Sequence, residues 1–220
     1  MTDSTDRLAD ATLRDFAEAL ASERPTPGGG SAAAVAATLA ASLTAMVVRL
    51  SLDRPKYQPH ADLHAEALSA SDATRGRFLQ LADEDVAAYA AYRSARRMAH
   101  DTPAEDQARV EATRAAARQA ALIPFTVVQE CHQQIDLVER LVGRTNGYVA
   151  SDLEVAALLL EGAARGAAAN VWVNLGAIED PGYTDAVTAE LDQRLQQIQS
   201  AVDRTRERIS KGVIRKPEGE

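Results

Sequence analysis

Apolar residues recur at helical spacing along nearly the whole chain, and no segment alternates apolar and polar residues with the period of two that is typical of a strand. Leu13, Phe16, Ala17 and Leu20 share one side of a first predicted helix over residues 8–21. Further helices are expected over residues 31–51, 60–98, 103–141, 151–178 and 184–209. The pattern predicts an all-α, single-domain multi-helix bundle over residues 1–220, with residues 211–220 as a loose tail.

Several helix boundaries follow from local sequence. Thr102-Pro103-Ala104-Glu105 is a capping box with proline at the first helical position, and Ser151-Asp152-Leu153-Glu154 is predicted to be a second one. Asp180-Pro181-Gly182 is expected to end a helix. Pro124 lies inside a helical pattern, where a proline is expected to kink or split the helix.

The second predicted helix opens on Pro27-Gly28-Gly29-Gly30-Ser31 and continues as a charge-free, alanine-rich run to Val48. Successive glycines leave the backbone N–H groups of a helix start uncovered, and the helix dipole favours negative charge there. We expect a pocket at this point that receives an anionic or carbonyl group. The run approaches membrane-spanning length, but its alanine, serine and threonine content favours a buried central helix.

A carboxylate lies inside an apolar stripe of the predicted helix over residues 60–98. With 100° per residue, Asp85 falls about 20° from Phe78, on the side that also carries Tyr89. Asp83 lies toward the side of the helix. Burial would raise the pKa of Asp85 and suit it to proton transfer. The alternative is a structural aspartate bonded to Tyr89 or to an arginine of a neighbouring helix.

The helix predicted over residues 151–178 has two apolar sides, so it is expected to be central to the fold. One of its stripes also carries Asp152, Asn170 and Asn174. Buried asparagines need hydrogen-bond partners. These are either the end of another helix or a ligand that offers several donors and acceptors.

The histidine and cysteine positions predict neither a metal site nor a catalytic nucleophile. His60 and His64 are one helical turn apart, but without a third ligand they are interpreted as a solvated surface pair. Cys131 and His132 are adjacent and point apart on a helix, so Cys131 is expected to be buried and inert.

Composition narrows the class of protein. Of 220 residues 46% are hydrophobic but only 4% aromatic, which suits helices packed through small side chains. The single cysteine fits a reducing compartment, and no apolar signal segment follows the polar first residues, so a cytoplasmic protein without membrane attachment is expected. The net charge of −8 argues against a general nucleic-acid surface.

Three blocks in order resemble one known family. They are Pro25-Thr26-Pro27-Gly28-Gly29-Gly30-Ser31 with Met46-Val47, then Leu81-Ala82-Asp83-Glu84-Asp85 with Tyr89, and finally Asn146, Ser151-Asp152-Leu153, Gly166, Asn170-Val171 and Asn174-Leu175. The chain resembles the formiminotransferase-cyclodeaminase family, in both its cyclodeaminase domain and its stand-alone methenyltetrahydrofolate cyclohydrolases. The resemblance covers about residues 13–208.

The resemblance implies an all-helical homodimer of the cyclodeaminase type. It also implies a small-molecule tetrahydrofolate substrate and no metal or redox cofactor. The expected reaction is hydrolysis of 5,10-methenyltetrahydrofolate to 10-formyltetrahydrofolate, with formiminotetrahydrofolate cyclodeaminase and a non-catalytic folate-binding protein as alternatives. Asp85 would transfer protons and Asp83 would support it. The implied substrate-binding residues are Pro27, Gly28, Gly29, Gly30, Ser31, Asn146, Asp152, Asn170 and Asn174.

Overall fold

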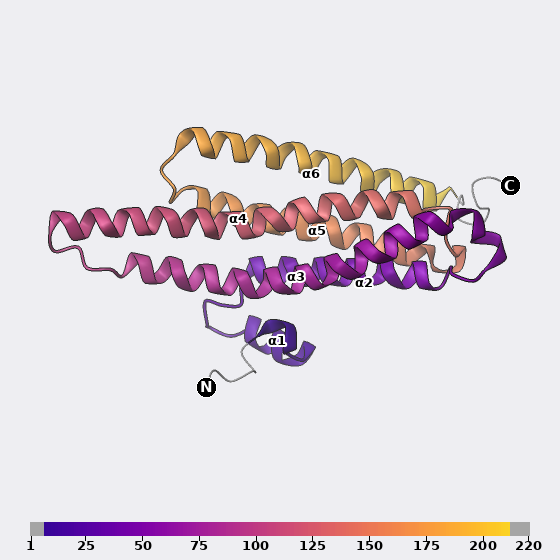
Figure 1. Cartoon of the computed structure of the whole chain (residues 1–220), viewed down its shortest axis with the longest axis horizontal. Helices are drawn as coiled ribbons and strands as arrows, with labels where there is room; N and C mark the ends of the chain where they lie inside the picture. Colours follow the sequence, from indigo (N-terminus) through magenta and orange to yellow (C-terminus); the bar gives the residue numbers. More distant parts are fainter. Residues whose placement is uncertain (1–6, 212–220) are drawn as a thin grey trace.

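Antiparallel helices build the whole of the described part of the molecule. The computed structural model describes residues 7–211, and within this range no strand is present. The helices are α1 (Leu13–Leu20), α2 (Gly29–Arg49), α3 (Ala61–Arg96), α4 (Pro103–Leu141), α5 (Ala150–Leu175) and α6 (Pro181–Ser210), with short 3₁₀ turns at Leu8–Asp10, Pro55–His60 and Gly147–Val149. Figure 1 shows α2 to α6 lying along the long axis of the molecule, each antiparallel to the one before it, with α1 set beside the bundle. The all-α bundle is confirmed, while the predicted tail lies almost entirely outside the described residues.

The centre of the bundle is formed by α2 and α5, which pack against each other and against α3 and α4 respectively. Their buried faces are largely alanine; Ala34, Ala37, Ala157 and Ala164 are each fully buried. Small side chains let helix backbones approach closely, as the composition predicted. Among residues 7–211, α2 is the one helix long and apolar enough to cross a membrane by length and composition. Its fully buried face supports the interpretation of a core helix.

Pro124 lies inside α4 without dividing it. A proline has no N–H to donate to the carbonyl four residues earlier, so the Ala120 carbonyl loses its helical partner. The Asn174 side chain of α5 supplies the missing donor, with Nδ2 2.9 Å from the Ala120 oxygen. The expected split was therefore wrong, because a neighbouring helix completes the hydrogen bonding at the proline.

The helix starts agree only in part with the predicted boundaries. The capping box at Thr102 is confirmed. The second capping box, predicted at Ser151, is wrong, because α5 begins at Ala150 and Ser151 already lies inside the helix. No side chain caps this helix start. Asp180 begins α6 rather than ending a helix, since its side chain accepts a hydrogen bond from the Tyr183 N–H.

The first predicted helix is also divided. A 3₁₀ turn ends at Asp10, and α1 starts after Thr12, whose hydroxyl accepts a hydrogen bond from the Asp15 N–H. The chain between the two segments is extended at Ala11 and Thr12, which local periodicity did not indicate.

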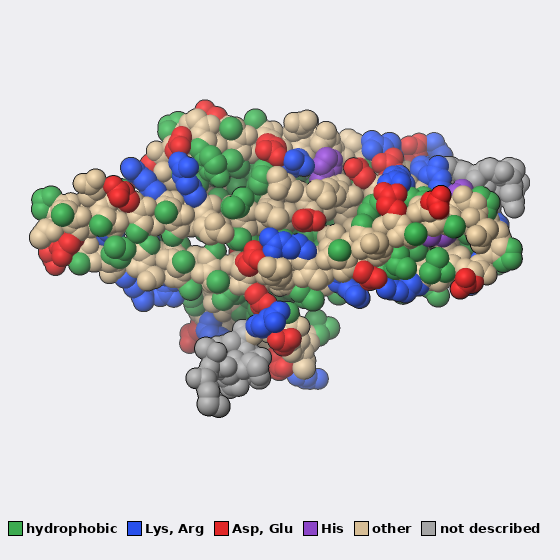
Figure 2. All heavy atoms as spheres, in the orientation of Figure 1, with side chains coloured by type: hydrophobic (Ala, Val, Ile, Leu, Met, Phe, Trp, Pro, Cys, Tyr) green, Lys and Arg blue, Asp and Glu red, His purple; other side chains and the backbone are tan. Residues whose placement is uncertain are grey.

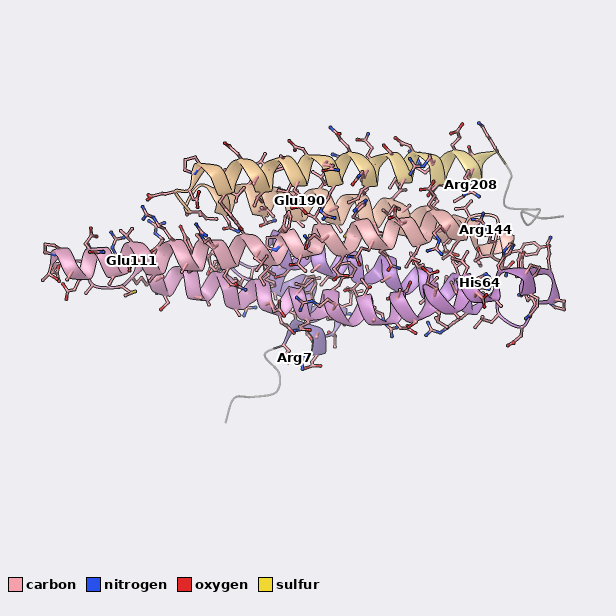
Figure 3. The ribbon with its side chains drawn as sticks, turned by 45° about the horizontal axis from the view of Figure 1, so that its top comes forward. Arg7, His64, Glu111, Arg144, Glu190 and Arg208 are labelled. Atoms are coloured by element: carbon pink, nitrogen blue, oxygen red, sulfur yellow. The ribbon has the colours of Figure 1, made fainter. Side chains whose placement is uncertain are left out.

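His64 is not part of a solvated surface pair. It is 2% exposed, and its Nε2 lies 2.7 Å from the Arg144 carbonyl oxygen, at the end of the bundle where Figure 3 labels both residues. The turn after α4 covers this histidine, a contact that only the tertiary fold creates. Cys131 is fully buried, and burial raises the pKa of its thiol, as expected for an inert cysteine.

Candidate active site

A pocket of about 210 Å³ lies at the N-terminal end of α2, where the glycine motif predicted one. Four helices and the loop before α2 contribute to it, because the start of α2 lies beside the middle of α3 and the C-terminal part of α5. Its walls are Pro25, Thr26, Gly28, Gly29, Gly30, Asp85, Tyr89, Tyr92, Ala120, Asn170, Val173 and Asn174.

Asp85 of α3 supplies the carboxyl group of this pocket. The Ser31 hydroxyl donates a hydrogen bond to its Oδ2 at 2.8 Å and also lies 3.2 Å from the Ala82 carbonyl oxygen. Burial raises the pKa of the Asp85 carboxyl, and hydrogen bonds from the side chain and backbone of Ser31 partly oppose that rise. The acid is therefore held in place and retains its proton to a higher pH than an exposed aspartate.

Gly30 is needed for Asp85 to occupy this position. A Cβ on Gly30 would lie 2.3 Å from Asp85 Oδ1 and 2.7 Å from its Cγ, far inside contact distance. The carboxylate thus packs directly on bare backbone. Gly28 is the N-cap residue and has no side chain that could cap the helix, so the first N–H groups of α2 remain available to a ligand in the pocket.

Two asparagines of α5 form the opposite wall. Asn170 Nδ2 donates to the Gly166 carbonyl at 2.8 Å, and a Cβ on Gly29 would come within 3.3 Å of that amide nitrogen. Asn174 is bonded to Ala120 of α4, so its amide nitrogen serves the fold. Neither asparagine bonds the end of another helix: Asn170 bonds within α5 and Asn174 bonds the middle of α4, and both line the pocket, so binding of a ligand by them stays a prediction.

The structure does not bring all of the predicted residues to this pocket. Asp83 lies two positions from Asp85, about 160° around the helix, and accepts a hydrogen bond from the Leu8 N–H at 2.6 Å. Pro27 is buried and lines, together with Asp83, a hollow beneath α1. Neither residue lines the pocket that contains Asp85.

Asn146 and Asp152 lie at the opposite end of the bundle. Eighteen helical residues separate Asp152 from Asn170, about 27 Å along α5. The Asn146 N–H donates to Ser51 Oγ at 2.8 Å, and its side chain accepts from the Tyr148 N–H, so this residue fixes the turn between α4 and α5 to the end of α2. The sequence block that contains them is a turn followed by one helix, α5, whose two ends are far apart.

Tyr89 and Tyr92 line the pocket although they were not predicted as site residues. They follow Asp85 by four and seven positions, which places all three on one helix face. That spacing was visible in the sequence. Ala120 and Val173 also line the pocket, but an alanine and a valine do not indicate a site in the sequence, and only the packing of the helices brings them there.

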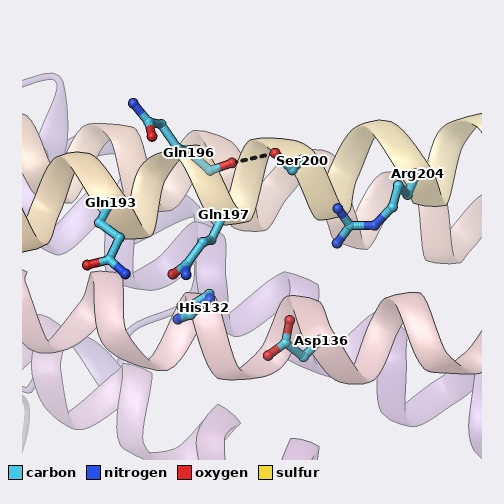
Figure 4. A pocket seen from close by; sticks show the side chains of 7 residues that line it. All are labelled: His132, Asp136, Gln193, Gln196, Gln197, Ser200 and Arg204. Atoms are coloured by element: carbon cyan, nitrogen blue, oxygen red, sulfur yellow. Dashed lines mark hydrogen bonds between the residues drawn. The ribbon is translucent and has the colours of Figure 1, made fainter.

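A larger hollow of about 690 Å³ lies between α4 and α6 and is shown in Figure 4. Amide and charged side chains line it, among them His132, Gln193 and Arg204. Arg204 is already paired with Glu139, and Arg194 with Glu190 borders the same groove. No glycine backbone lies in its wall, whereas the smaller pocket joins glycine backbone to a half-buried carboxyl and is the better candidate for chemistry.

Comparison with known proteins decides the family. A family model described as formiminotransferase-cyclodeaminase matches residues 12–193. The chain belongs to the formiminotransferase-cyclodeaminase family. It is 32% identical over 203 residues to the methenyltetrahydrofolate cyclohydrolase of Methylorubrum extorquens, covering 92% of this chain and 97% of that protein. The region that the family model matches contains every residue of the pocket.

Other relatives are similar over a smaller share of their own length or only in fold. The formimidoyltransferase-cyclodeaminase of Rattus norvegicus is 30% identical over 190 residues, which are 86% of this chain but 35% of the rat protein. The solved structure of formiminotetrahydrofolate cyclodeaminase from Thermotoga maritima superimposes with a TM-score of 0.83 at 24% identity and covers 93% of this chain. The bundle is therefore the cyclodeaminase fold.

Proposed function

We propose that this protein is a folate one-carbon enzyme that hydrolyses 5,10-methenyltetrahydrofolate to 10-formyltetrahydrofolate, with Asp85 as general acid and base. The observation that carries the proposal is the placement of Asp85: half-buried, held by Ser31, and pressed on the glycine backbone of a pocket. The near-complete coverage of a named stand-alone cyclohydrolase supports this reaction over others.

The pocket offers the groups that the reaction needs. Water adds to the carbon that bridges N5 and N10, and the Asp85 carboxylate accepts a proton from it as the C–O bond forms. When the C–N5 bond breaks, N5 takes up a proton from the Asp85 carboxyl, and the hydroxyl proton of the intermediate leaves as the formyl C=O forms. Burial raises the pKa of Asp85, which makes its carboxylate a stronger base for the first transfer than an exposed aspartate would be.

Neighbouring groups bind and orient the substrate. The first N–H groups of α2, at Gly29 and Gly30, point at a carbonyl or anionic part of the pterin. Asn170 supplies amide hydrogen bonds from the opposite wall. The bridging carbon keeps its oxidation state throughout, so proton transfer suffices and we propose that no metal or redox cofactor takes part.

We also propose that the protein is a cytoplasmic homodimer. An exposed apolar surface along the central helices supports the dimer: Leu39 of α2 is 51% exposed, and Val155 and Leu158 of α5 are 45% and 44% exposed. Large apolar side chains left exposed on core helices favour association. Asn146 and Asp152 can contribute to catalysis only if a second copy brings them to the pocket, since about 27 Å separate Asp152 from Asn170 within one chain.

A direct assay tests the reaction. Purified protein is mixed with 5,10-methenyltetrahydrofolate, and loss of its near-ultraviolet absorbance is compared with the spontaneous rate. Asp85→Asn should reduce kcat at least about 100-fold with its helicity retained. Unchanged turnover in that variant would remove Asp85 from the mechanism.

The cyclodeaminase reaction is the second candidate, because it passes through a tetrahedral carbon at the same position and the relatives include named cyclodeaminases. A parallel assay with 5-formiminotetrahydrofolate that measures ammonia separates the two. Binding of both folates without turnover of either would instead favour the non-catalytic folate-binding protein.

A further inference from the structure

Three arginines follow the catalytic pocket along α3. Arg93, Arg96 and Arg97 line a hollow of about 390 Å³ whose remaining wall consists of Tyr89 and Tyr92. The same two tyrosines line the 210 Å³ pocket that contains Asp85. The two hollows therefore share a wall and are adjacent along α3.

The order of side chains along the helix is acid, aromatic, aromatic, base. Asp85, Tyr89, Tyr92 and Arg96 are spaced by four, three and four residues, which places them on one face of α3. Arg93 and Arg96 lie eight and eleven residues beyond Asp85, about 12–17 Å along the helix axis. A substituted aromatic ring followed by an amino acid spans such a distance.

The arginines are available to bind an anion. Within residues 7–211, no ion pair or hydrogen bond joins any of the three to a carboxylate, whereas Arg114 and Arg118 nearby are paired with Glu179 and Asp180. Arg93 instead lies over the ring of Tyr89, 5.9 Å from its centroid. In Figure 2, basic side chains gather on the α3 edge of the bundle toward the end where α3 meets α4. A protein of net charge −8 thus concentrates unpaired positive charge beside its pocket.

A structural role explains only part of this arrangement. Arg93 and Arg96 stand in the last turn of α3, where cations favour the helix dipole. That effect gives no reason for the arginines to share a tyrosine wall with the pocket. It also predicts that their loss lowers helix stability without changing recognition of substrate.

We propose that Arg93, Arg96 and Arg97 form an anion subsite that binds the carboxylates of the glutamate portion of a tetrahydrofolate substrate. The inference rests on the proposed function. The one-carbon bridge lies at Asp85, the p-aminobenzoyl ring lies on Tyr89 and Tyr92, and the terminal carboxylates meet the guanidinium groups. Guanidinium groups bind carboxylates through paired, charge-assisted hydrogen bonds.

The test removes the charges and the ligand carboxylates separately. In the triple variant Arg93→Gln, Arg96→Gln, Arg97→Gln, KM for 5,10-methenyltetrahydrofolate should rise about 10- to 100-fold with kcat nearly unchanged. For 5,10-methenyltetrahydropteroate, which lacks the glutamate, wild type and variant should have the same KM.

A matched control carries the same change in net charge elsewhere: Arg75→Gln, Arg165→Gln and Arg206→Gln remove three exposed arginines that do not line either hollow. Its KM for the glutamate-containing substrate should stay near the wild-type value. Equal KM increases in the two triple variants would overturn the subsite, because long-range charge would then explain the effect.

A second outcome would also overturn it: an equal rise in KM for the pteroate substrate, which would assign the arginines to the pocket itself. Failure of the proposed function is seen independently, as absence of turnover of either substrate by the wild type. In that case the affinities of tetrahydrofolate and tetrahydropteroate, measured by calorimetry on wild type and variant, still decide the subsite.

Discussion

Replacing Gly30 by alanine should displace the catalytic carboxylate while leaving the fold intact. The new Cβ would meet three atoms of Asp85 at 2.3–2.8 Å, about 1 Å or more inside an ordinary contact. Because these atoms belong to a short side chain on a packed helix, the carboxyl must rotate away from Ser31. A displacement of about 1 Å costs on the order of 100-fold in rate, and complete loss of the acid costs about 10²–10⁴-fold.

The expected effect on stability is much smaller. Alanine in the first turn of α2 gains about 0.5–1 kcal/mol over glycine, and loss of the hydrogen bond between Ser31 and Asp85 costs about 1.5–3 kcal/mol. The difference lowers the free energy of unfolding by about 1–2 kcal/mol and Tm by roughly 2–8 °C. Turnover and thermal melting, measured on the same preparation, check both numbers.

Gly76→Ala is the matched control. Gly76 lies in α3, the same helix as Asp85, and a Cβ there would meet nothing within 4 Å. This variant should keep full activity and gain about 0.5–1 kcal/mol. Wild-type kcat in Gly30→Ala would refute the reasoning, since it would mean that catalysis does not depend on the position of Asp85. An added loss from Gly30→Ala in an Asp85→Asn background would refute it as well, because a shared mechanism predicts no further loss.

Three other variants test the burial of Asp85, the hydrogen bond to Ala120 and the exposed apolar face of α2. Burial raises the pKa of Asp85 in the native state above its value in the unfolded state. Between these two pKa values the native state binds more protons, so the free energy of unfolding falls as the pH rises through that window. Asp85→Asn should flatten this slope in thermal melts recorded from pH 4 to pH 8. Asn174→Ala leaves the Ala120 carbonyl without a donor and should cost about 1–3 kcal/mol in denaturant unfolding, whereas in a Pro124→Ala background, where an N–H returns, the cost should largely disappear. Leu39→Glu places a charge on the exposed apolar face of α2 and should yield monomers by light scattering, a result that a persistent dimer would contradict.

The sequence by itself determined much of the fold and the central part of the site. Helical periodicity, alanine content and the proline and glycine breaks determined an all-α bundle, because these are local properties of the chain. Periodicity also placed Asp85 inside an apolar stripe, and the glycine motif marked a helix start with open N–H groups. The resemblance to the family implied that Asp85 and the glycine motif lie in one pocket, and the structure shows that they do.

Only the tertiary structure decided how segments distant in sequence meet. Asp83 and Asp85 are almost neighbours in sequence, yet they face the N-terminal segment and the pocket respectively. Asp152 and Asn170 share one helix, yet its length separates them. Pro124 was compatible with its helix because Asn174, fifty residues later, supplies the missing donor. Helical phase fixes the direction in which a side chain points, but which helix lies opposite depends on the packing of the whole bundle.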